Sequence, residues 1–535
     1  MTPTDPVSVL AVGRNGAALT RFQDVLQIFS NDPRVRVRYT AAPGSPHADG
    51  TSTYLAALGA KTIAWANATG APHRLAVATS ANAALHELRA PVLLLPHGAG
   101  RHKLAGTHPY GLSPRQLLHG GRVVPAAIGL SDTDQFEILS RSCPPALERA
   151  VLVGDPCYDR LAAAAHLTPM LRRALRLAGR ELVVISSTWG PGSLFAAAPD
   201  LPEQLLAALP ADQYALALVL HPNIWSDYGR DQIVGRWLER AVRAGLMVVP
   251  WEQGWQAAAL AAHYVVGDHG SVTYYAAALG KPVLLAAFDE VGLVPGTGLT
   301  RLAQRAVRLD PRGDVPAQLA AAAREADKPL IEPGFAPAGR SLEALRDLAY
   351  GLMDLAPPAT VPDPPAVTEP DLHAPQPTCY RVRVHATAAD AADGSSARVE
   401  RYSALVPGSL APDDDRPLHI AADLEHPQLR HLHRAAVLYT RSERSKQAAA
   451  MPIKPDEVFR DYPGARVAAH VEGEACTVML AEGAQARAHV SGADPAIAAS
   501  LVYARLSAVL PGAAFDPVVL ELGSRRVTVV FTPVP

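Results

Sequence analysis

The sequence predicts an α/β protein with two Rossmann-like, doubly wound parallel sheets that face a cleft, followed by a smaller α+β domain. Two observations favour this class. Short apolar runs alternate with helical patterns from residue 7 to about residue 285, as expected for parallel strands covered by helices on both faces. Eight prolines between residues 354 and 377 then interrupt the pattern, and the chain beyond them alternates apolar and polar residues.

The length of 535 residues exceeds what one ordinary hydrophobic core spans, so several domains are expected. We place a first Rossmann-like domain over residues 1–155 and a second over 156–352. A semi-rigid, proline-rich linker over 353–377 leads to a third domain over 378–535, whose role the sequence does not indicate.

Composition excludes several classes of protein. The net charge of −2 provides no basic excess for nucleic acid. The four cysteines lie far apart without a C-x-x-C pair, which argues against a zinc site or a disulfide framework and fits a reducing cytoplasm. No apolar run reaches the roughly 18 residues of a spanning helix, and no secretory signal is recognisable. The abundance of Ala, Pro and Arg is typical of GC-rich bacterial coding.

The first domain is predicted to begin with a strand over 7–12, a turn at Gly13-Arg14-Asn15-Gly16 and a helix over 17–29. A glycine-bearing turn between strand and helix can bind an anion through backbone N–H groups. The turn is not G-x-G-x-x-G, so a dinucleotide site is disfavoured, and a plain strand-to-helix turn is an equal alternative. The other predicted elements are strands at 35–39, 75–79, 92–95, 126–130 and 150–153 and a helix at 82–88.

The second domain opens with a predicted helix over 161–177 that carries Arg172, Arg173 and Arg176. These arginines either meet an anionic membrane or form a solvated helix face. The pattern that follows predicts strands at 182–185, 216–220, 247–250, 264–266 and 283–285 and helices at 203–209, 231–244, 256–262 and 272–279.

The third domain is expected to be α+β with a mainly antiparallel sheet. It contains no convincing catalytic cluster. Asp413, Asp414 and Asp415 follow a proline and indicate a solvated turn rather than a metal site, so no metal is expected. Strands are predicted at 380–385, 397–402, 467–471 and 527–531, and helices at 427–438 and 495–510.

Polar signatures follow four of the predicted strands. Ligands of parallel sheets bind at the carboxyl ends of the strands, so these signatures predict one cleft. The helix that begins after Gly270 also presents unpaired N–H groups, which attract an anion. The signatures are Pro96-His97-Gly98, Ser187-Thr188-Trp189-Gly190, His221-Pro222 and Asp268-His269-Gly270-Ser271.

In type and order these motifs resemble those of GT-B-fold transferases, most of all the CDP-glycerol glycerophosphotransferases of teichoic-acid synthesis. The resemblance covers roughly residues 5–350. The H-G-T/I motif of that family resembles His97-Gly98-Ala99, its P-T-W segment resembles Ser187-Thr188-Trp189, and its H-P pair matches His221-Pro222. Its V-x-G-N-P-R-Y-D run resembles residues 153–159, and its T-D-Y-S-S-V…L-G-K-P-V run resembles residues 267–283.

The resemblance implies a transferase that moves a glycosyl or glycerophosphoryl group from a CDP- or UDP-linked donor to a hydroxyl acceptor, without a cofactor or a bound metal. The first domain would hold the acceptor and the second the nucleotide donor. His97 would act as the general base. The donor diphosphate would be held by His221, the Ser271 hydroxyl and the backbone N–H groups of Gly270, Ser271, Val272 and Thr273.

Several residues have two interpretations each. Asp268 either orients His221 or caps the helix that follows. Trp189, beside Thr188, either stacks on the nucleotide base or packs against the protein. His269 replaces a tyrosine of the family and either contacts the base or phosphate or plays no part. Candidates for an acceptor or phosphate loop are Gly13, Asn15, Gly16 and Gly98.

Departures from the family motivate alternatives. Gly270 replaces a serine, Lys103 comes one residue later than the family's lysine, and Tyr274 or Tyr275 stands where sugar-nucleotide relatives carry an acid for the ribose hydroxyls. The main alternative is a catalytically degenerate binding or scaffold protein. A UDP-sugar 2-epimerase relative is disfavoured, because its D-S-G-G-x-x-E signature lacks a glycine and the glutamate here. The protein is expected in the cytoplasm, with peripheral contact to the inner membrane face and a protein partner for the third domain as open alternatives.

Overall fold

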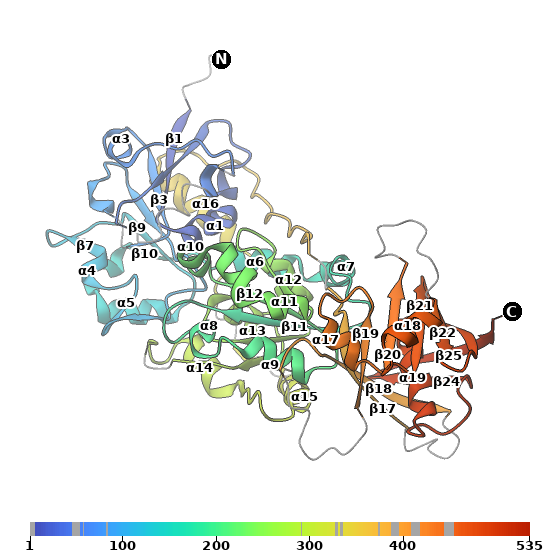
Figure 1. The fold of residues 1–535 in the computed structure, drawn as a ribbon. Coiled ribbons are helices and arrows are strands. Elements are labelled where there is room, and N and C mark those ends of the chain that lie inside the picture. The colour runs from blue at the N-terminus through green and yellow to red at the C-terminus, as the bar shows by residue number, and fades with distance from the viewer. Residues whose placement is uncertain are drawn as a thin grey trace.

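Three units follow one another along the chain in this computed structural model (Figure 1). Two are built on parallel sheets and the third on a closed barrel. The structure describes residues 6–44, 54–56, 58–81, 84–289, 292–326, 330–331, 335–372, 375–386, 395–407, 418–442 and 454–534. The acidic run at 413–415 therefore lies outside the described residues.

The first unit is a six-stranded parallel sheet in the order β10-β9-β4-β3-β1-β2, which confirms the doubly wound prediction. Successive residues of β1 enter two different cores, Val9 and Ala11 on one face and Leu10 and Val12 on the other, because both faces are covered. The strands are β1 (Val7–Gly13), β2 (Val35–Ala41), β3 (Leu75–Ala78), β4 (Val92–Leu94), β9 (Ala127–Leu130) and β10 (Ala150–Leu152).

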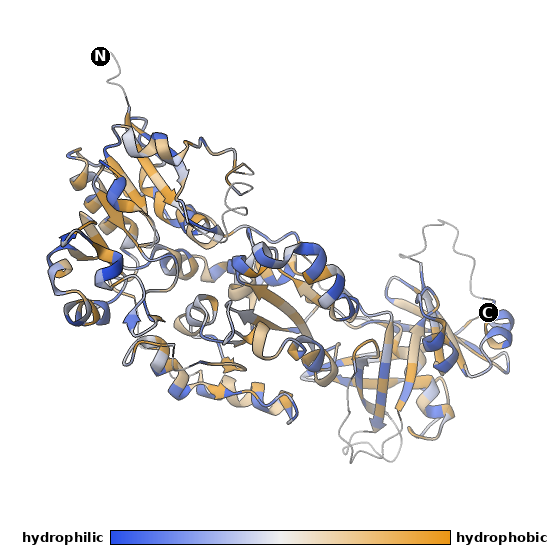
Figure 2. Cartoon of the chain, turned by 60° about the vertical axis from the view of Figure 1, so that its left-hand side comes forward, coloured by the Kyte–Doolittle hydropathy of each residue, from blue (hydrophilic) through white to orange (hydrophobic). Residues whose placement is uncertain are grey.

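Helices α1 (Gly16–Val25) and α5 (Asp134–Ser142) lie on opposite faces of this sheet. Asn15 caps α1 by accepting a hydrogen bond from the Ala18 N–H at 2.9 Å. In place of the helix predicted at 82–88, the described residues form only a 3₁₀ turn, Leu85–Glu87. Figure 2 shows that the strands of this sheet are predominantly apolar, in keeping with their burial.

The second unit is another six-stranded parallel sheet, in the order β13-β12-β11-β14-β15-β16. Its strands are β11 (Glu181–Ser187), β12 (Tyr214–Leu220), β13 (Leu246–Val248), β14 (Tyr264–Gly267), β15 (Val283–Leu285) and β16 (Val307–Arg308). Its helices include α8 (Leu194–Ala197), α9 (Leu201–Ala208), α10 (Pro222–Arg230), α12 (Trp255–Ala261), α13 (Ser271–Ala278), α14 (Gly298–Arg305) and α15 (Val315–Glu325).

Two long helices predicted in this unit are each broken. The segment predicted as one helix over 161–177 forms α6 (Pro156–Ala163), a 3₁₀ turn and α7 (Thr168–Ala174). Asp155 caps α6, and a second proline near the start of α7 begins a new helix because proline lacks the N–H that would continue the old one. The segment predicted at 231–244 forms a π-helical turn, Asp231–Trp237, followed by α11 (Glu239–Arg243).

The chain then returns to the first unit. Helix α16 (Ser341–Leu352) packs with β1 and β3 in one core, and the Tyr350 hydroxyl donates to Asp32 at 2.9 Å. The predicted boundary at residue 352 placed this helix in the second domain, but its packing belongs to the first sheet. No helix was predicted for these residues, and a sequence pattern does not indicate which of two sheets a helix covers.

The proline-rich stretch after α16 is extended, as predicted, and forms no helix or strand over its described residues. It lies against the second unit. Ala366 accepts a hydrogen bond from Arg160 at 2.7 Å, and Val367 is buried in the core beside α13.

The third unit is a closed barrel of nine strands rather than the α+β domain with a mainly antiparallel sheet that was predicted. Six of its nine strand pairs are antiparallel, but β18–β24, β19–β20 and β20–β21 are parallel. The strands are β17 (Cys379–Ala386), β18 (Ser396–Ser403), β19 (Leu418–Asp423), β20 (Val437–Arg441), β21 (Val467–Glu472), β22 (Ala475–Leu480), β23 (Gln485–Val490), β24 (Val518–Leu522) and β25 (Arg525–Pro533).

The barrel encloses the apolar side of α19 (Ile497–Leu506), whose side chains share one core with most of the strands. Closure depends on the pairing of Ser396 with Val519, two residues far apart in the chain. The helix predicted at 427–438 is shorter, α17 (Leu429–Arg434), because the residues after it enter β20. A further helix, α18 (Pro455–Asp461), precedes β21.

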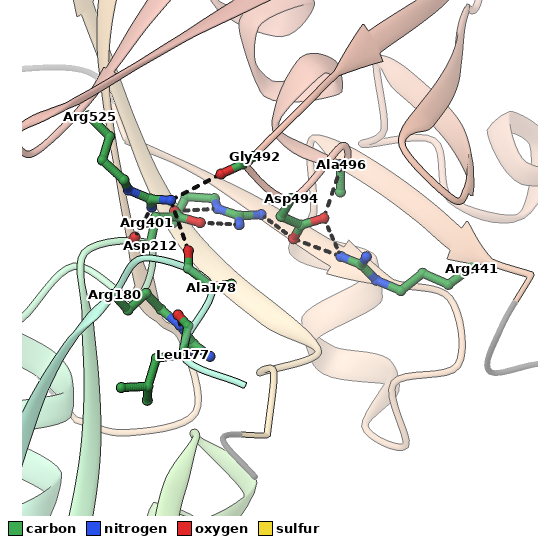
Figure 3. Close-up of polar contacts among 10 residues, drawn as sticks. All are labelled: Leu177, Ala178, Arg180, Asp212, Arg401, Arg441, Gly492, Asp494, Ala496 and Arg525. Atoms are coloured by element: carbon green, nitrogen blue, oxygen red, sulfur yellow. Dashed lines mark hydrogen bonds and ion pairs between the residues drawn. The ribbon is translucent and has the colours of Figure 1, made fainter. Parts of the chain in front are cut away.

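A chain of buried ion pairs joins the barrel to the second unit (Figure 3). Arg401 of β18 donates to Asp212 at 2.7 Å and to Asp494 at 2.9 Å. Arg441 donates to the same Asp494 at 2.7 Å. Burial alone would raise the pKa of Asp494, but the two guanidinium groups hold that pKa below the ordinary value of a carboxyl group. The network fixes how the barrel sits on the second sheet.

We expect Asp212→Asn to destabilise the protein by about 3 kcal/mol, because Arg401 would stay buried with one of its two carboxylates neutralised. Thermal unfolding and the rate of limited proteolysis between the two units would measure the effect. The matched control is Asp231→Asn, which removes an exposed ion pair with Arg236 and should change stability by less than about 0.5 kcal/mol. Equal behaviour of the two variants would contradict the role given to the network.

Candidate functional site

The two parallel-sheet units touch where the loop after β4 meets the start of α13. The Ala99 N–H donates to the Ser271 hydroxyl at 3.2 Å. A Cβ atom at Gly98 would lie 2.5 Å from the same oxygen, so only glycine fits without a shift. The structure therefore places the predicted His97-Gly98 signature directly against the predicted helix start.

The loop that carries His97 is tied to the second unit by backbone hydrogen bonds. The Val294 N–H donates to the His102 carbonyl at 2.8 Å, and the Leu104 N–H donates to the Gly292 carbonyl at 2.8 Å. Lys103, between them, extends its amine to the Thr188 hydroxyl at 3.2 Å. Residues from β4, β11 and β14 thus meet at one junction, at the carboxyl ends of their strands.

Asp268 organises the second unit's side of this junction. Its buried carboxylate accepts hydrogen bonds from the N–H groups of Thr188, Leu194 and Gly270 at 2.9, 2.8 and 2.9 Å. These hydrogen bonds differ from the helix cap considered for Asp268, because none goes to the second or third residue of α13, and none of them reaches His221. Asp268 holds two strand-end loops together.

His97 is half-buried beside the edge of the Tyr110 ring, at 5.8 Å between centroids. Burial and, to a lesser degree, the charges of Arg101 and Lys103 lower the pKa of His97 to about 4, against a hydrogen bond to the Thr79 backbone. The imidazole is therefore neutral at pH 7 and can accept a proton.

Arg101 is a residue of the junction that the sequence analysis missed. Its side chain is 5% exposed, and its Nη1 donates to the Gly111 carbonyl at 3.0 Å. Its Nε and Nη2 are buried without a hydrogen-bond partner in the structure. Together with Lys103 it adds two cations to the loop that meets the start of α13, which favours an anionic ligand there. The basic run G-R-H-K directly after the H-G motif was the available signal.

The start of α13 offers backbone groups more than side chains. Gly270 precedes the helix as its N-cap and provides no capping side chain. The Ser271 side chain is exposed apart from its contact with Ala99, whereas the Thr273 side chain is buried against Gly267. An anion at this position would therefore meet the Ser271 hydroxyl and the N–H groups of Ser271, Val272 and Thr273, whereas the predicted Gly270 N–H already donates to Asp268.

His221, Trp189 and His269 lie around the same strand ends. His221 Nδ1 accepts from the Asn223 N–H at 3.1 Å and so caps α10. The His221 ring lies 6.1 Å from that of Trp189, which is 46% exposed and can meet a ligand. The His269 ring packs edge-on against Phe288, and burial lowers the pKa of His269 to about 4.

The glycine turn after β1 is filled by protein. A Cβ atom at Gly16 would lie 3.0 Å from the Trp251 ring and 3.2 Å from Pro222. Gly13 approaches the Leu19 side chain in the same way. These contacts favour the plain-turn interpretation of Gly13, Asn15 and Gly16 over a phosphate loop.

Both tyrosines of α13 point into the packing between the units. The Tyr275 hydroxyl donates to Asp155 at 3.1 Å, and Asp155 also accepts from Arg21 at 2.9 Å. The Tyr274 ring lies 4.8 Å from that of His102. This helix therefore presents no carboxylate to a ribose, and its second turn holds the first unit in place.

Arg172, one of the three arginines predicted to form a basic helix face, is bound to the protein and is not available to contact a membrane. Its guanidinium donates to the Ala261 and Ala262 carbonyls at 2.9 and 3.4 Å, at the end of α12. Arg173 and Arg176 are exposed. Among the described residues, no helix combines the length and the apolar character needed to span a bilayer.

Comparisons with known proteins give structural likeness only. No family model matches the chain, and no curated protein does. The chain is similar to the wall teichoic acid polymerase TagF, with a TM-score of 0.43 and 12% identity over 66% of this chain and 90% of that one. It is also similar to Anabaena HepE in complex with UDP-glucose, with a TM-score of 0.39 and 14% identity over 65% of this chain and all of that one.

We expect Gly98→Ala to lower the unfolding temperature and to disturb the junction, because the added methyl group would meet the Ser271 oxygen. Removing that oxygen as well, in Gly98→Ala/Ser271→Ala, should restore most of the loss, since the remaining Ser271 carbon lies 3.5 Å away. Thermal unfolding of both single variants and the double variant would give the coupling free energy.

Gly70→Ala is the control, because a Cβ atom there meets nothing within 4 Å. A double variant no more stable than Gly98→Ala alone would show that Gly98 and Ser271 do not touch in solution.

Proposed function

We propose that the protein is a transferase that moves a glycosyl or glycerophosphoryl group from a nucleotide-activated donor, CDP- or UDP-linked, to a hydroxyl acceptor. One observation carries the proposal. A neutral histidine, His97, and two cations, Arg101 and Lys103, lie on the loop of the first unit that meets a helix start of the second. Ligands of parallel sheets bind at such strand ends.

The donor's phosphates would lie at the start of α13. The Ser271 hydroxyl and the N–H groups of Ser271, Val272 and Thr273 would donate hydrogen bonds to them, and Lys103 and Arg101 would balance their charge. These donors are already oriented by Asp268 and by the pairing of residues 102–104, so little reorganisation is needed when the leaving nucleotide gains negative charge. The exposed face of Trp189 is available to stack on the base.

The reaction would be a single displacement. The acceptor oxygen forms a new bond to the transferred carbon or phosphorus atom while the bond to the donor's phosphate oxygen breaks, and the leaving nucleotide keeps the electron pair. The acceptor's proton passes to the neutral imidazole of His97. Bound phosphates would offset the charges of Arg101 and Lys103, so the pKa of His97 would rise in the complex and make it a stronger base.

The alternative is a binding protein that has lost catalysis. It is favoured by the placement of Tyr274 and Tyr275 in the packing between units, which leaves α13 without a carboxylate for a ribose. A cytoplasmic location, peripheral membrane contact through Arg173 and Arg176, and a protein partner for the barrel are further proposals that go with the transferase.

A panel of UDP, CDP, GDP and their sugar or glycerol conjugates, read by thermal unfolding, tests the function. A donor at 100 times its Kd should stabilise the native state by about 2.7 kcal/mol. His97→Ala should keep this stabilisation and lower turnover by about a hundredfold or more.

His108→Ala is the matched control, because His108 is exposed on the hairpin that follows the same loop. Turnover unchanged in His97→Ala would remove this residue from the mechanism. Stabilisation by a nucleotide without any transfer would favour the binding protein.

The pH dependence of kcat/KM should also report His97. A general base must be unprotonated, so activity should fall as pH decreases through its pKa in the free enzyme. Because that pKa is lowered to about 4, kcat/KM should persist at pH 5.5, and the acid limb of kcat should lie at higher pH than that of kcat/KM. An acid limb of kcat/KM near pH 6.5 or above would assign the base to another group.

A further inference from the structure

A groove of about 540 Å³ lies between the second unit and the barrel, away from the junction described above. One wall is α11, with Glu239, Arg240 and Arg243. The other wall is formed by two barrel segments, residues 404–407 after β18 and residues around Gln428 and Arg430 before and within α17. The groove exists only because the barrel is docked on the second unit.

Both walls are held in place. Val406 is 3% exposed and inserts into the core of the second unit together with its neighbour Leu405. The Ala211 N–H donates to the Arg401 carbonyl at 2.7 Å, close to the buried ion pair of Arg401 with Asp212 (Figure 3). A ligand in the groove would therefore meet a formed site rather than a loose contact between units.

The lining of the groove carries more positive than negative charge. Three arginines and one glutamate line it. Arg243 pairs with Glu239 at 3.1 Å, and Arg240 reaches Glu203, outside the groove, at 3.4 Å. Arg430 donates only to the neutral Gln428 amide oxygen at 2.9 Å, and no carboxylate within the described residues pairs with it. At least one guanidinium in the groove therefore lacks a counter-charge.

Besides burial, Arg243 and Arg430 contribute to lowering the pKa values of two histidines, His426 and His431. Burial and, to a lesser degree, the charges of His431, Arg243 and Arg430 lower the pKa of His426 to about 4. His426 is 4% exposed, and its Nε2 is buried without a partner, while Nδ1 contacts the Thr378 hydroxyl at 2.7 Å. The same two arginines, one from each wall, act on His426, so their charges converge on one region.

We propose that this groove binds a phosphorylated small molecule that bridges the second unit and the barrel. Guanidinium groups match the oxygens of a phosphate with paired hydrogen bonds, which a groove with three arginines from two walls can provide. The volume falls in the range of small-molecule sites and exceeds what a single ion fills. The site is separate from the proposed transferase centre and does not depend on that function.

Isothermal titration of the full chain with inorganic pyrophosphate tests the proposal. All variants carry Lys103→Gln, so that binding at the junction contributes less. In this background, Arg243→Gln/Arg430→Gln should weaken binding at least about tenfold, because both phosphate-facing arginines are lost. The matched control, Arg236→Gln/Arg460→Gln, removes one exposed arginine from each unit and should bind like its parent.

Equal loss in both double variants would mean a general effect of charge and would overturn the site, as would unchanged binding in Arg243→Gln/Arg430→Gln. A tungstate soak of crystals of the full chain gives an independent readout. Anomalous density between Arg243 and Arg430 is expected, and density only at the start of α13 would contradict the proposal.

Discussion

The pairing of residues 102–104 with residues 292–294 is the constraint on which the candidate site depends. Two doubly wound units do not by themselves bring their strand ends together. Here a loop of the first unit is hydrogen-bonded to the second through its backbone, and the absence of a side chain at Gly98 lets the loop reach Ser271. Lys103 of the first unit then reaches Thr188 of the second. The first unit therefore supplies the histidine and the cations of the candidate site, and the second supplies the start of α13.

Buried arginines have two different roles in the molecule. Arg401 has two carboxylates within 3 Å, so its charge is balanced by the protein and it serves to join two units. Arg101 is equally buried, yet two of its guanidinium nitrogens have no partner. A charge taken out of water without a counter-charge costs free energy unless something else supplies one. Arg401 thus joins two units, whereas Arg101 keeps two buried donors that the described residues do not satisfy.

The parallel sheets were predictable because each strand is a short apolar run bounded by glycine, proline or polar residues, as at 264–267 and 92–94. The strand-end positions of His97, Thr188 and Ser271 followed from the same pattern. What the pattern could not supply depends on contacts between distant residues. The closure of the barrel through Ser396 and Val519 is one such case.

The orientation of Tyr275 toward Asp155 is a second feature that depends on contacts between distant residues. A tyrosine in a helix beside a predicted site looks the same in the sequence whether it faces a ligand or a neighbouring unit. Arg101 shows the reverse case, since an arginine in a loop is ordinarily solvated and the basic run around it does not reveal that its side chain is buried.

The return of α16 to the first sheet makes the second unit an insertion within the first. The chain crosses between the two sheets once before α6 and once before α16, and the proline-rich stretch then crosses again along the second unit, bound through Ala366. If the junction opened, the second unit would rotate about the two chain segments before α6 and before α16. The proline-rich stretch, which is bound to the second unit, would restrain that rotation. The barrel is joined to the inserted unit by buried ion pairs, so the two would move together as one rigid body.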